Sequence, residues 1–199
     1  MIQIKILIVG QLQTNCYLLI GTETKKCIII DPGDDAEYIE RVISSDNLKP
    51  VLIIATHGHF DHILAVTELK LAYKIPFFMS KKDNFILNRL ESTLIYFKNY
   101  DYKLIKPEIN RDLDKINKIK LEDHLIRIIK IPGHTPGSIC IYIKNINSAI
   151  TGDLIFKDGL GRYDFKYGSE KDLKKSIRKI ILLGNKVRIY PGHGDNFKI

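Results

Sequence analysis

The first half of the chain alternates short β-branched runs with polar or glycine-containing turns, a pattern that predicts β-strands. The runs with strand character are 2–9, 16–20, 27–30, 51–55 and 77–79. Three longer stretches space their apolar residues at helical intervals, and these are 36–43, 63–73 and 84–97. The run at 51–55 is apolar at every position, which indicates a strand buried on both faces.

Strand character returns in the second half of the chain. The expected strands are 118–121, 125–131, 139–144, 148–151 and 187–190, and helical spacing covers 170–183. Because strands are followed by helices twice over, we expect an α+β fold, and two sheets packed face to face with helices outside would satisfy the pattern. Other α+β layouts fit it as well. Without an internal repeat or a Pro/Gly/Ser-rich linker, we expect a single domain over residues 1–199.

The composition is that of an ordinary globular protein, with 45% hydrophobic and 27% charged residues. The cysteines, Cys16, Cys27 and Cys140, are odd in number and lie in strand-like runs, so we expect buried, reduced thiols and not a disulfide framework. The apolar N-terminus carries Lys5 and reads as a strand, not a signal peptide. We therefore expect a cytoplasmic protein with no membrane partner.

The formal net charge of +8 raises the question of nucleic-acid binding. The lysines are spread along the chain, however, and clusters such as Lys25-Lys26 and Lys81-Lys82 are brief and lie in expected turns or on solvated helix faces. A nucleic-acid partner is therefore disfavoured, although a nucleic-acid processing enzyme stays as a minor alternative. The oligomeric state is left open.

The main chemical signal is the run from Thr56 to His62, Thr-His-Gly-His-Phe-Asp-His, which directly follows the expected strand at 51–55. On an extended segment the side chains of His57 and His59 point the same way and can converge on one ion. Asp61 and His62 lie where the chain turns into a helix, and can face a second ion. Imidazole and carboxylate groups are good ligands for zinc, iron or manganese.

Three further candidates lie at the ends of expected strands, in turns that contain glycine. They are His134 in Gly-His-Thr-Pro-Gly-Ser, Asp153 in Thr-Gly-Asp and His193 in Pro-Gly-His-Gly. Functional groups are often placed on such loops by a rigid scaffold. The sixth histidine, His124, falls in a polar turn and reads as a solvated surface residue.

Taken together, these motifs resemble those of the metallo-β-lactamase superfamily, in that family's order, from about Thr14 to Gly194. The resemblance implies an αββα sandwich of two mixed sheets with helices on both outer faces and a pair of divalent metal ions at one rim. The implied ligands are His57, His59 and His134 for the first metal, Asp61, His62 and His193 for the second, and Asp153 as the bridge between them. Asp31 matches a recurrent aspartate that fixes the orientation of a ligand.

Within the superfamily, the segment from Gly152 to Phe165 is similar to the glyoxalase II (hydroxyacylglutathione hydrolase) type. Arg162 falls where those enzymes place a basic residue that meets the substrate, and an arginine suits a carboxylate there. Glyoxalase II enzymes also carry a C-terminal helical region that supplies much of the glutathione contact, and this chain ends six residues after His193, so we expect that region to be absent. The segment 84–106 is then the helical insert expected to cover the site.

The resemblance predicts a dinuclear hydrolase, most simply with zinc, that acts on a small acyl thioester such as S-lactoylglutathione. Two adjacent metals activate water as the nucleophile, and Asp61 is expected to orient it. Persulfide dioxygenases, which use one iron, share the motifs of this chain and are the main alternative. Hydrolysis of β-lactams is disfavoured because such enzymes act outside the cytoplasm.

Overall fold

Two six-stranded mixed sheets form the centre of the computed structural model, which describes residues 1–98 and 105–199. The strands of the first sheet, in spatial order, are β1 (Ile2–Val9), β2 (Thr14–Gly21), β3 (Lys26–Ile30), β4 (Lys49–Ile54), β5 (Phe77–Met79) and β6 (Arg111–Asp112). The first three strands are antiparallel, and β3 to β6 run parallel. The parallel strands β3, β4 and β5 are joined through helices α1 (Ala36–Ser45) and α2 (Val66–Tyr73).

The second sheet is built from the C-terminal half of the chain. Its strands, in spatial order, are β14 (Phe197–Lys198), β13 (Arg188–Pro191), β10 (Ser148–Gly152), β9 (Ile139–Ile143), β8 (His124–Lys130) and β7 (Lys118–Leu121). Its pairs are antiparallel except β10 with β13, which are parallel and are joined through helix α5 (Glu170–Ile181). A separate hairpin pairs β11 (Ile155–Phe156) with β12 (Gly159–Leu160).

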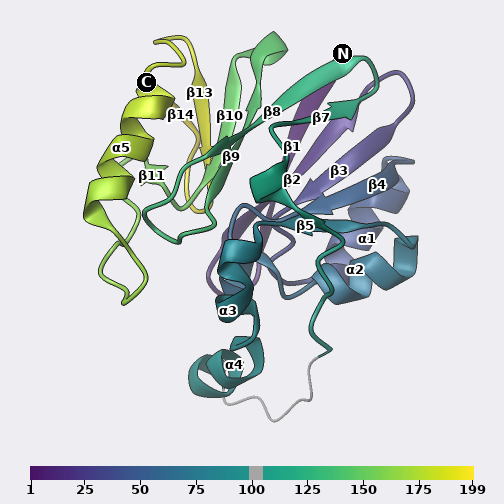
Figure 1. Ribbon diagram of the computed structural model, residues 1–199. Helices are drawn as coiled ribbons and strands as arrows, with labels where there is room; N and C mark the ends of the chain where they lie inside the picture. Colours follow the sequence, from purple (N-terminus) through teal and green to yellow (C-terminus); the bar gives the residue numbers. More distant parts are fainter. Residues whose placement is uncertain (99–104) are drawn as a thin grey trace.

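The sheets pack face to face, and helices cover both outer faces (Figure 1). Strand β2 shows why, because it is buried at every position. Tyr17 and Leu19 join the core between the sheets, whereas Cys16 and Leu18 join the core under α1 and α2. On the other side, Leu173 of α5 packs against the second sheet. The predicted αββα sandwich is confirmed, and the shared core between the sheets leads us to infer one domain.

Three predicted features differ from the structure. The helix expected from residue 63 begins at Val66, because residues 60–62 form a 3₁₀ turn. The helix expected over 84–97 is two helices, α3 (Asn84–Leu87) and α4 (Leu90–Lys98), and the part of the predicted insert at 99–104 lies outside the described residues. His124 is not in a turn: it begins β8, is half-buried and contacts Asn145 at 2.8 Å.

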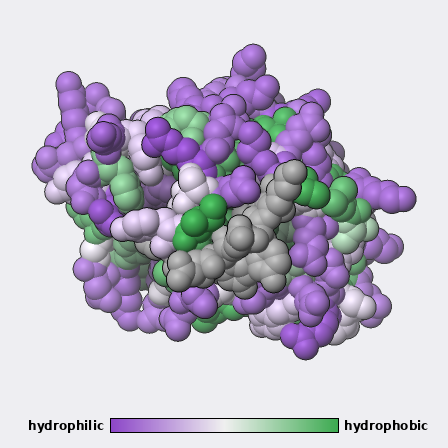
Figure 2. All heavy atoms as spheres, turned by 90° about the horizontal axis from the view of Figure 1, so that it is seen from below, coloured by the Kyte–Doolittle hydropathy of each residue, from purple (hydrophilic) through white to green (hydrophobic). Residues whose placement is uncertain are grey.

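For the residues that the structure describes, the cysteines and the surface match the expectations from the sequence. Cys16, Cys27 and Cys140 are buried and free of disulfides. Figure 2 shows the face that carries α3 and α4, where hydrophilic residues cover most of the area and hydrophobic residues lie in small groups between them, as is usual for a surface in water. Among the described residues, none of the helices has the length and apolarity to span a bilayer.

Truncation of the core between the sheets should destabilise the protein strongly. Ile141 on β9 is fully buried, so Ile141→Ala should lower the free energy of unfolding by about 2–5 kcal/mol. On the neighbouring strand, Leu125 is 53% exposed, and Leu125→Ala should change it by no more than about 0.5 kcal/mol. Urea denaturation measures both, and equal losses would contradict the assignment of Ile141 to the core.

Candidate metal centre

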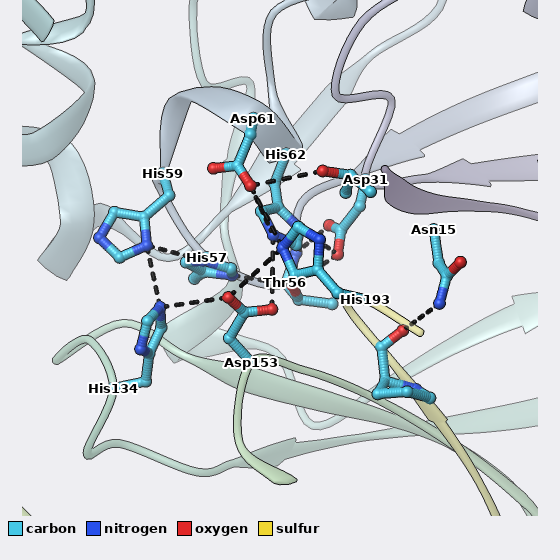
Figure 3. Close-up of polar contacts among 12 residues, drawn as sticks. Asn15, Asp31, Thr56, His57, His59, Asp61, His62, His134, Asp153 and His193 are labelled. Atoms are coloured by element: carbon cyan, nitrogen blue, oxygen red, sulfur yellow. Dashed lines mark hydrogen bonds and ion pairs between the residues drawn. The ribbon is translucent and has the colours of Figure 1, made fainter. Parts of the chain in front are cut away.

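The seven side chains predicted as ligands meet at one rim of the sandwich, on loops that follow strands (Figure 3). Four come from the loop after β4, and one each from the loops after β8, β10 and β13. They are His57, His59, Asp61, His62, His134, Asp153 and His193. The rigid sheets thus bring together groups that lie up to 136 residues apart, from His57 to His193.

The first group consists of three histidines whose inward nitrogens nearly touch. His59 Nδ1 lies 3.0 Å from His57 Nε2 and 2.9 Å from His134 Nε2. The segment that carries His57 and His59 is irregular and not a strand, yet the two rings converge as the i, i+2 spacing predicts. Three imidazole nitrogens at this spacing match the donor set of a catalytic zinc site.

The second group lies beside the first and contains Asp61, His62 and His193. Asp61 Oδ2 is 3.2 Å from His193 Nε2 and 3.6 Å from His62 Nε2. Asp153 spans both groups, because its Oδ1 is 3.5 Å from His62 Nε2 and its Oδ2 is 3.6 Å from His134 Nε2. The cluster is therefore suitable for a dinuclear metal site.

Two of the histidines are oriented by backbone carbonyls. His134 Nδ1 lies 2.7 Å from the carbonyl oxygen of Arg162, and His193 Nδ1 lies 3.0 Å from that of Leu12. A carbonyl oxygen only accepts, so each ring must donate from Nδ1. In a neutral ring, Nε2 then carries the lone pair, and in both rings this nitrogen faces the cluster.

Asp31 and Thr56 orient two more rings in the same way. Asp31 is fully buried and accepts from the backbone N–H and the hydroxyl of Thr56, both at 2.6 Å, and from His62 Nδ1 at 3.0 Å. Because the Thr56 hydroxyl gives its only proton to Asp31, it must accept from His57 Nδ1, 3.1 Å away. Both rings are left with Nε2 turned toward the cluster, and the contact predicted for Asp31 is present.

Two buried atoms in the middle of the cluster, His62 Nε2 and Asp153 Oδ1, have no hydrogen-bond partner among the described residues. The distance between them, 3.5 Å, is longer than an ordinary hydrogen bond. Buried polar atoms without partners are rare because they cost free energy, and a missing ion is one of the accepted reasons for them. The donor atoms present therefore fit divalent cations.

The pKa values of the cluster also fit cation binding. Burial and the neighbouring histidines hold the pKa of His57 well below its ordinary range and lower that of His59 to about 3, so both rings are neutral at pH 7. Burial raises the pKa of Asp61 and Asp153, but the histidines, His62 foremost, lower it further, and both carboxyls stay ionised. Neutral imidazoles and ionised carboxylates are the forms that ligate metals.

The pKa of His62 is shifted in the opposite direction. Burial lowers its pKa, but the carboxylates of Asp61, Asp153 and Asp31 outweigh burial and raise it well above the ordinary value. In the absence of a cation, a proton on His62 therefore offsets the charge of the three aspartates. A metal that binds there takes the place of that proton.

The N-terminal strand β2 holds the loop of His193 in place. Asn15 donates from its backbone to the carbonyl oxygen of Gly192 at 2.7 Å and from its side chain to that of Pro191 at 3.0 Å. The Tyr17 hydroxyl also donates to Pro191 O, at 2.5 Å. Gly192 itself packs so tightly that a Cβ there would lie 2.0 Å from Asp153 Oδ1, so no larger residue fits without displacing the carboxylate.

A second buried aspartate, Asp83, was missed by the sequence analysis. It accepts from the Thr135 hydroxyl at 2.6 Å and from the backbone N–H groups of Gly137 at 2.7 Å and Gly58 at 3.0 Å. Burial is the main influence on its pKa and raises it, against these hydrogen bonds. Gly58 separates His57 from His59, and Thr135 follows His134, so Asp83 ties together the two loops that carry the first histidine group.

An apolar cavity of about 450 Å³ opens over the cluster. Its lining includes His59, Asp61, His134 and Asp153, and this volume is within the range of small-molecule sites. These four residues are the contribution of the cluster to the lining, while aromatic and aliphatic side chains form most of the walls. A substrate in the cavity would lie directly against the cluster.

Arg162, predicted to bind the substrate, lies in the wall of this cavity. Its guanidinium makes a bidentate ion pair with Asp164, with two N···O distances of 2.9 Å, and lies 4.5 Å from the centre of the Phe165 ring. The arginine is therefore in the expected place, but its charge already has a partner.

The tyrosine Tyr167, which the sequence analysis did not single out, lies beside Phe165 with the rings stacked at 5.3 Å. Its hydroxyl is 2.8 Å from His59 Nε2, so it contacts the nitrogen that His59 turns away from the cluster. All five histidines of the cluster thus have their outer nitrogen held by an oxygen atom. Such contacts fix ring orientation at metal sites.

Comparison with known proteins agrees with this geometry. The family model of the metallo-beta-lactamase superfamily matches residues 9–193 of this chain. The chain belongs to that superfamily. The hydroxyacylglutathione hydrolase GloC of Haemophilus influenzae is 35% identical over 96% of this chain and 91% of its own length.

Two solved structures are similar over 98% of this chain and 94% of their own, each at 29% identity. One is BLEG-1, described as a B3 metallo-beta-lactamase, with a TM-score of 0.89, and the other is TTHA1623 in a di-iron-bound form, with a TM-score of 0.85.

Replacement of the carboxylate that joins the two loops should loosen the first histidine group. In Asp83→Asn, the amide N–H₂ would face a backbone N–H, and hydrogen bonds to a buried charge would be lost. The free energy of unfolding should therefore fall by about 2–4 kcal/mol. Zinc should also be lost more readily to a competing chelator. Urea denaturation and chelator titration measure both effects.

The matched control for this variant is Asp123→Asn, which removes a carboxylate that is 96% exposed. It should leave both measurements unchanged. If Asp83→Asn retained stability and zinc as well as the control does, Asp83 would not tie the loops together.

Proposed function

We propose that this chain is a dinuclear metal-dependent hydrolase that acts on small acyl thioesters. The observation that carries the proposal is the pair of adjacent ligand groups, spanned by Asp153, at the floor of an apolar cavity. The similarity to a hydroxyacylglutathione hydrolase supports the thioester as the substrate class.

The proposed ligand assignment follows the two groups. His57, His59 and His134 would hold the first ion. Asp61, His62 and His193 would hold the second, and Asp153, which lies within 3.6 Å of both groups, would contribute its carboxylate between them. Nitrogen and carboxylate donors suit zinc best among the common divalent ions, with iron or manganese as alternatives that the same donors accept.

When bound, two such cations supply Lewis acidity and lower the pKa of a water molecule toward neutrality, which makes hydroxide available as a nucleophile. The protein then has to orient that nucleophile toward the acyl carbon. Asp61 is the group best placed to do so, because it lines the cavity and stays ionised. Thr14 donates to Asp61 Oδ2 at 3.3 Å and fixes the carboxylate.

The cavity walls are suited to an acyl thioester. Phe85, Ile86, Leu90 and Phe156 give an apolar surface for the acyl chain and the carrier, and they exclude water from the floor. We also propose that Arg162 contacts the carrier, with Asp164 reducing its net charge.

The alternative with one iron, a persulfide dioxygenase, would use only part of the cluster. The second group argues for the dinuclear hydrolase, because His62 Nε2 is buried without a hydrogen-bond partner among the described residues, and Asp153 can reach both groups. The proposal therefore predicts a second ion.

The proposal is tested by metal analysis together with a substrate panel. The purified protein should bind about two zinc ions per chain and should hydrolyse S-lactoylglutathione and simple acyl thioesters faster than the β-lactam nitrocefin. One iron per chain with oxygen uptake on a persulfide would establish the dioxygenase instead, and preferential hydrolysis of nitrocefin would establish a β-lactamase.

Asp61→Asn should lower kcat for the preferred thioester by at least about 10²–10³-fold, since an amide neither ligates as well nor accepts a proton from water. Asp195→Asn is the control, because this carboxylate is 79% exposed and pairs only with Lys157 among the described residues. Steady-state kinetics after metal loading measure both variants. Full activity of Asp61→Asn would remove this residue from the proposed mechanism.

A further inference from the structure

One wall of the cavity comes from the insert formed by α3 and α4. The insert contributes side chains from both helices and from the junction between them, namely Phe85, Ile86, Arg89, Leu90 and Thr93. The opposite wall comes from the chain after β10, with Phe156, Leu160, Arg162, Phe165 and Tyr167. Phe85 and Tyr167 meet edge to face, with ring centres 5.1 Å apart, so the two walls touch above the cluster.

Each wall carries one arginine, and the two differ in how their charge is compensated. Arg162 is neutralised by its bidentate pair with Asp164. Arg89 is exposed at the junction of α3 and α4, and the described residues offer its guanidinium no carboxylate within ion-pair distance. Arg89 thus adds a positive charge, unpaired among the described residues, to the lining of a cavity whose walls are otherwise mainly apolar.

Arg89 lines the same cavity as the cluster. The lining also includes Tyr167, whose hydroxyl lies 2.8 Å from His59 Nε2. A substrate group at Arg89 would therefore belong to the same molecule whose acyl carbon lies over the cluster.

We propose that Arg89 determines specificity by binding an anionic group, a carboxylate or a phosphate, on the thiol carrier of the substrate. This inference rests on the proposed thioester hydrolysis. A planar guanidinium can make two hydrogen bonds to either anion, which fixes the orientation of the carrier as well as its affinity. The insert thereby orients the thioester bond toward the cluster, and a neutral carrier gains nothing from this contact.

The test compares Arg89→Gln and Arg89→Lys with the wild-type zinc enzyme on three thioesters. The probes are S-lactoylglutathione with two carboxylates, the same thioester with both carboxylates esterified, and acetyl-coenzyme A with phosphates. Arg89→Gln should raise KM for the preferred anionic probe about tenfold with kcat nearly unchanged, which corresponds to the loss of one charge-assisted hydrogen bond. KM for the esterified probe should stay the same, and Arg89→Lys should recover part of the loss.

The control is Arg178→Gln, which removes the same charge from the exposed face of α5, outside the cavity lining. It should leave every KM unchanged. The anionic probe that suffers more from Arg89→Gln identifies the carrier group as carboxylate or phosphate. Equal effects of Arg89→Gln on the anionic and esterified probes, or an equal effect of Arg178→Gln, would overturn the proposal.

A binding measurement separates this inference from the proposed activity. S-methylglutathione and free coenzyme A, which are not hydrolysed, are titrated calorimetrically into the wild-type and Arg89→Gln proteins. Weaker binding of one of them to Arg89→Gln supports the anion contact even if no thioester is hydrolysed, in which case only the proposed function fails. Equal binding to both proteins, with or without hydrolysis, overturns the anion contact.

Discussion

The structure depends on how the negative charges and lone pairs of a compact set of buried polar atoms are compensated. Inward nitrogens of five histidines and the carboxylates of Asp61 and Asp153 lie within one small volume, and His62 Nε2 has no hydrogen-bond partner there among the described residues. Such a cluster is costly without positive charge among the lone pairs. A proton on His62 supplies part of that charge in the free protein, and divalent cations would supply the rest.

The sheets and several buried hydrogen bonds hold the loops of this cluster in place. The sheets end at one rim, and each ligand loop is then tied to a loop distant in sequence. Asp31 orients the loop after β4, Asp83 joins that loop to the loop of His134, and Asn15 of β2 anchors the loop of His193. These ties are buried hydrogen bonds, which fix the positions of the ligand loops.

Apolar periodicity predicted the strands and dense histidine motifs predicted the clustered residues, because both are local signals. The αββα sandwich was implied by the resemblance of these motifs to the metallo-β-lactamase superfamily. What the sequence did not reveal depends on tertiary contacts. Asp83 lies in a lysine-rich turn that reads as solvated, and only the folded chain places it against Gly58 and Gly137. The break before α4 that presents Arg89 to the cavity has no proline or glycine to mark it, and the pairing of Arg162 with Asp164 is equally invisible from spacing.

The central claim, that the seven groups form one cradle for a pair of cations, is tested most directly by anomalous X-ray diffraction at the zinc edge from crystals grown with zinc. The account predicts two anomalous peaks about 3.5–4 Å apart. One should lie among His57, His59 and His134, the other beside His62 and His193, with Asp153 between them. A single peak in either group, or zinc bound elsewhere while the cluster keeps only its internal contacts, would contradict it.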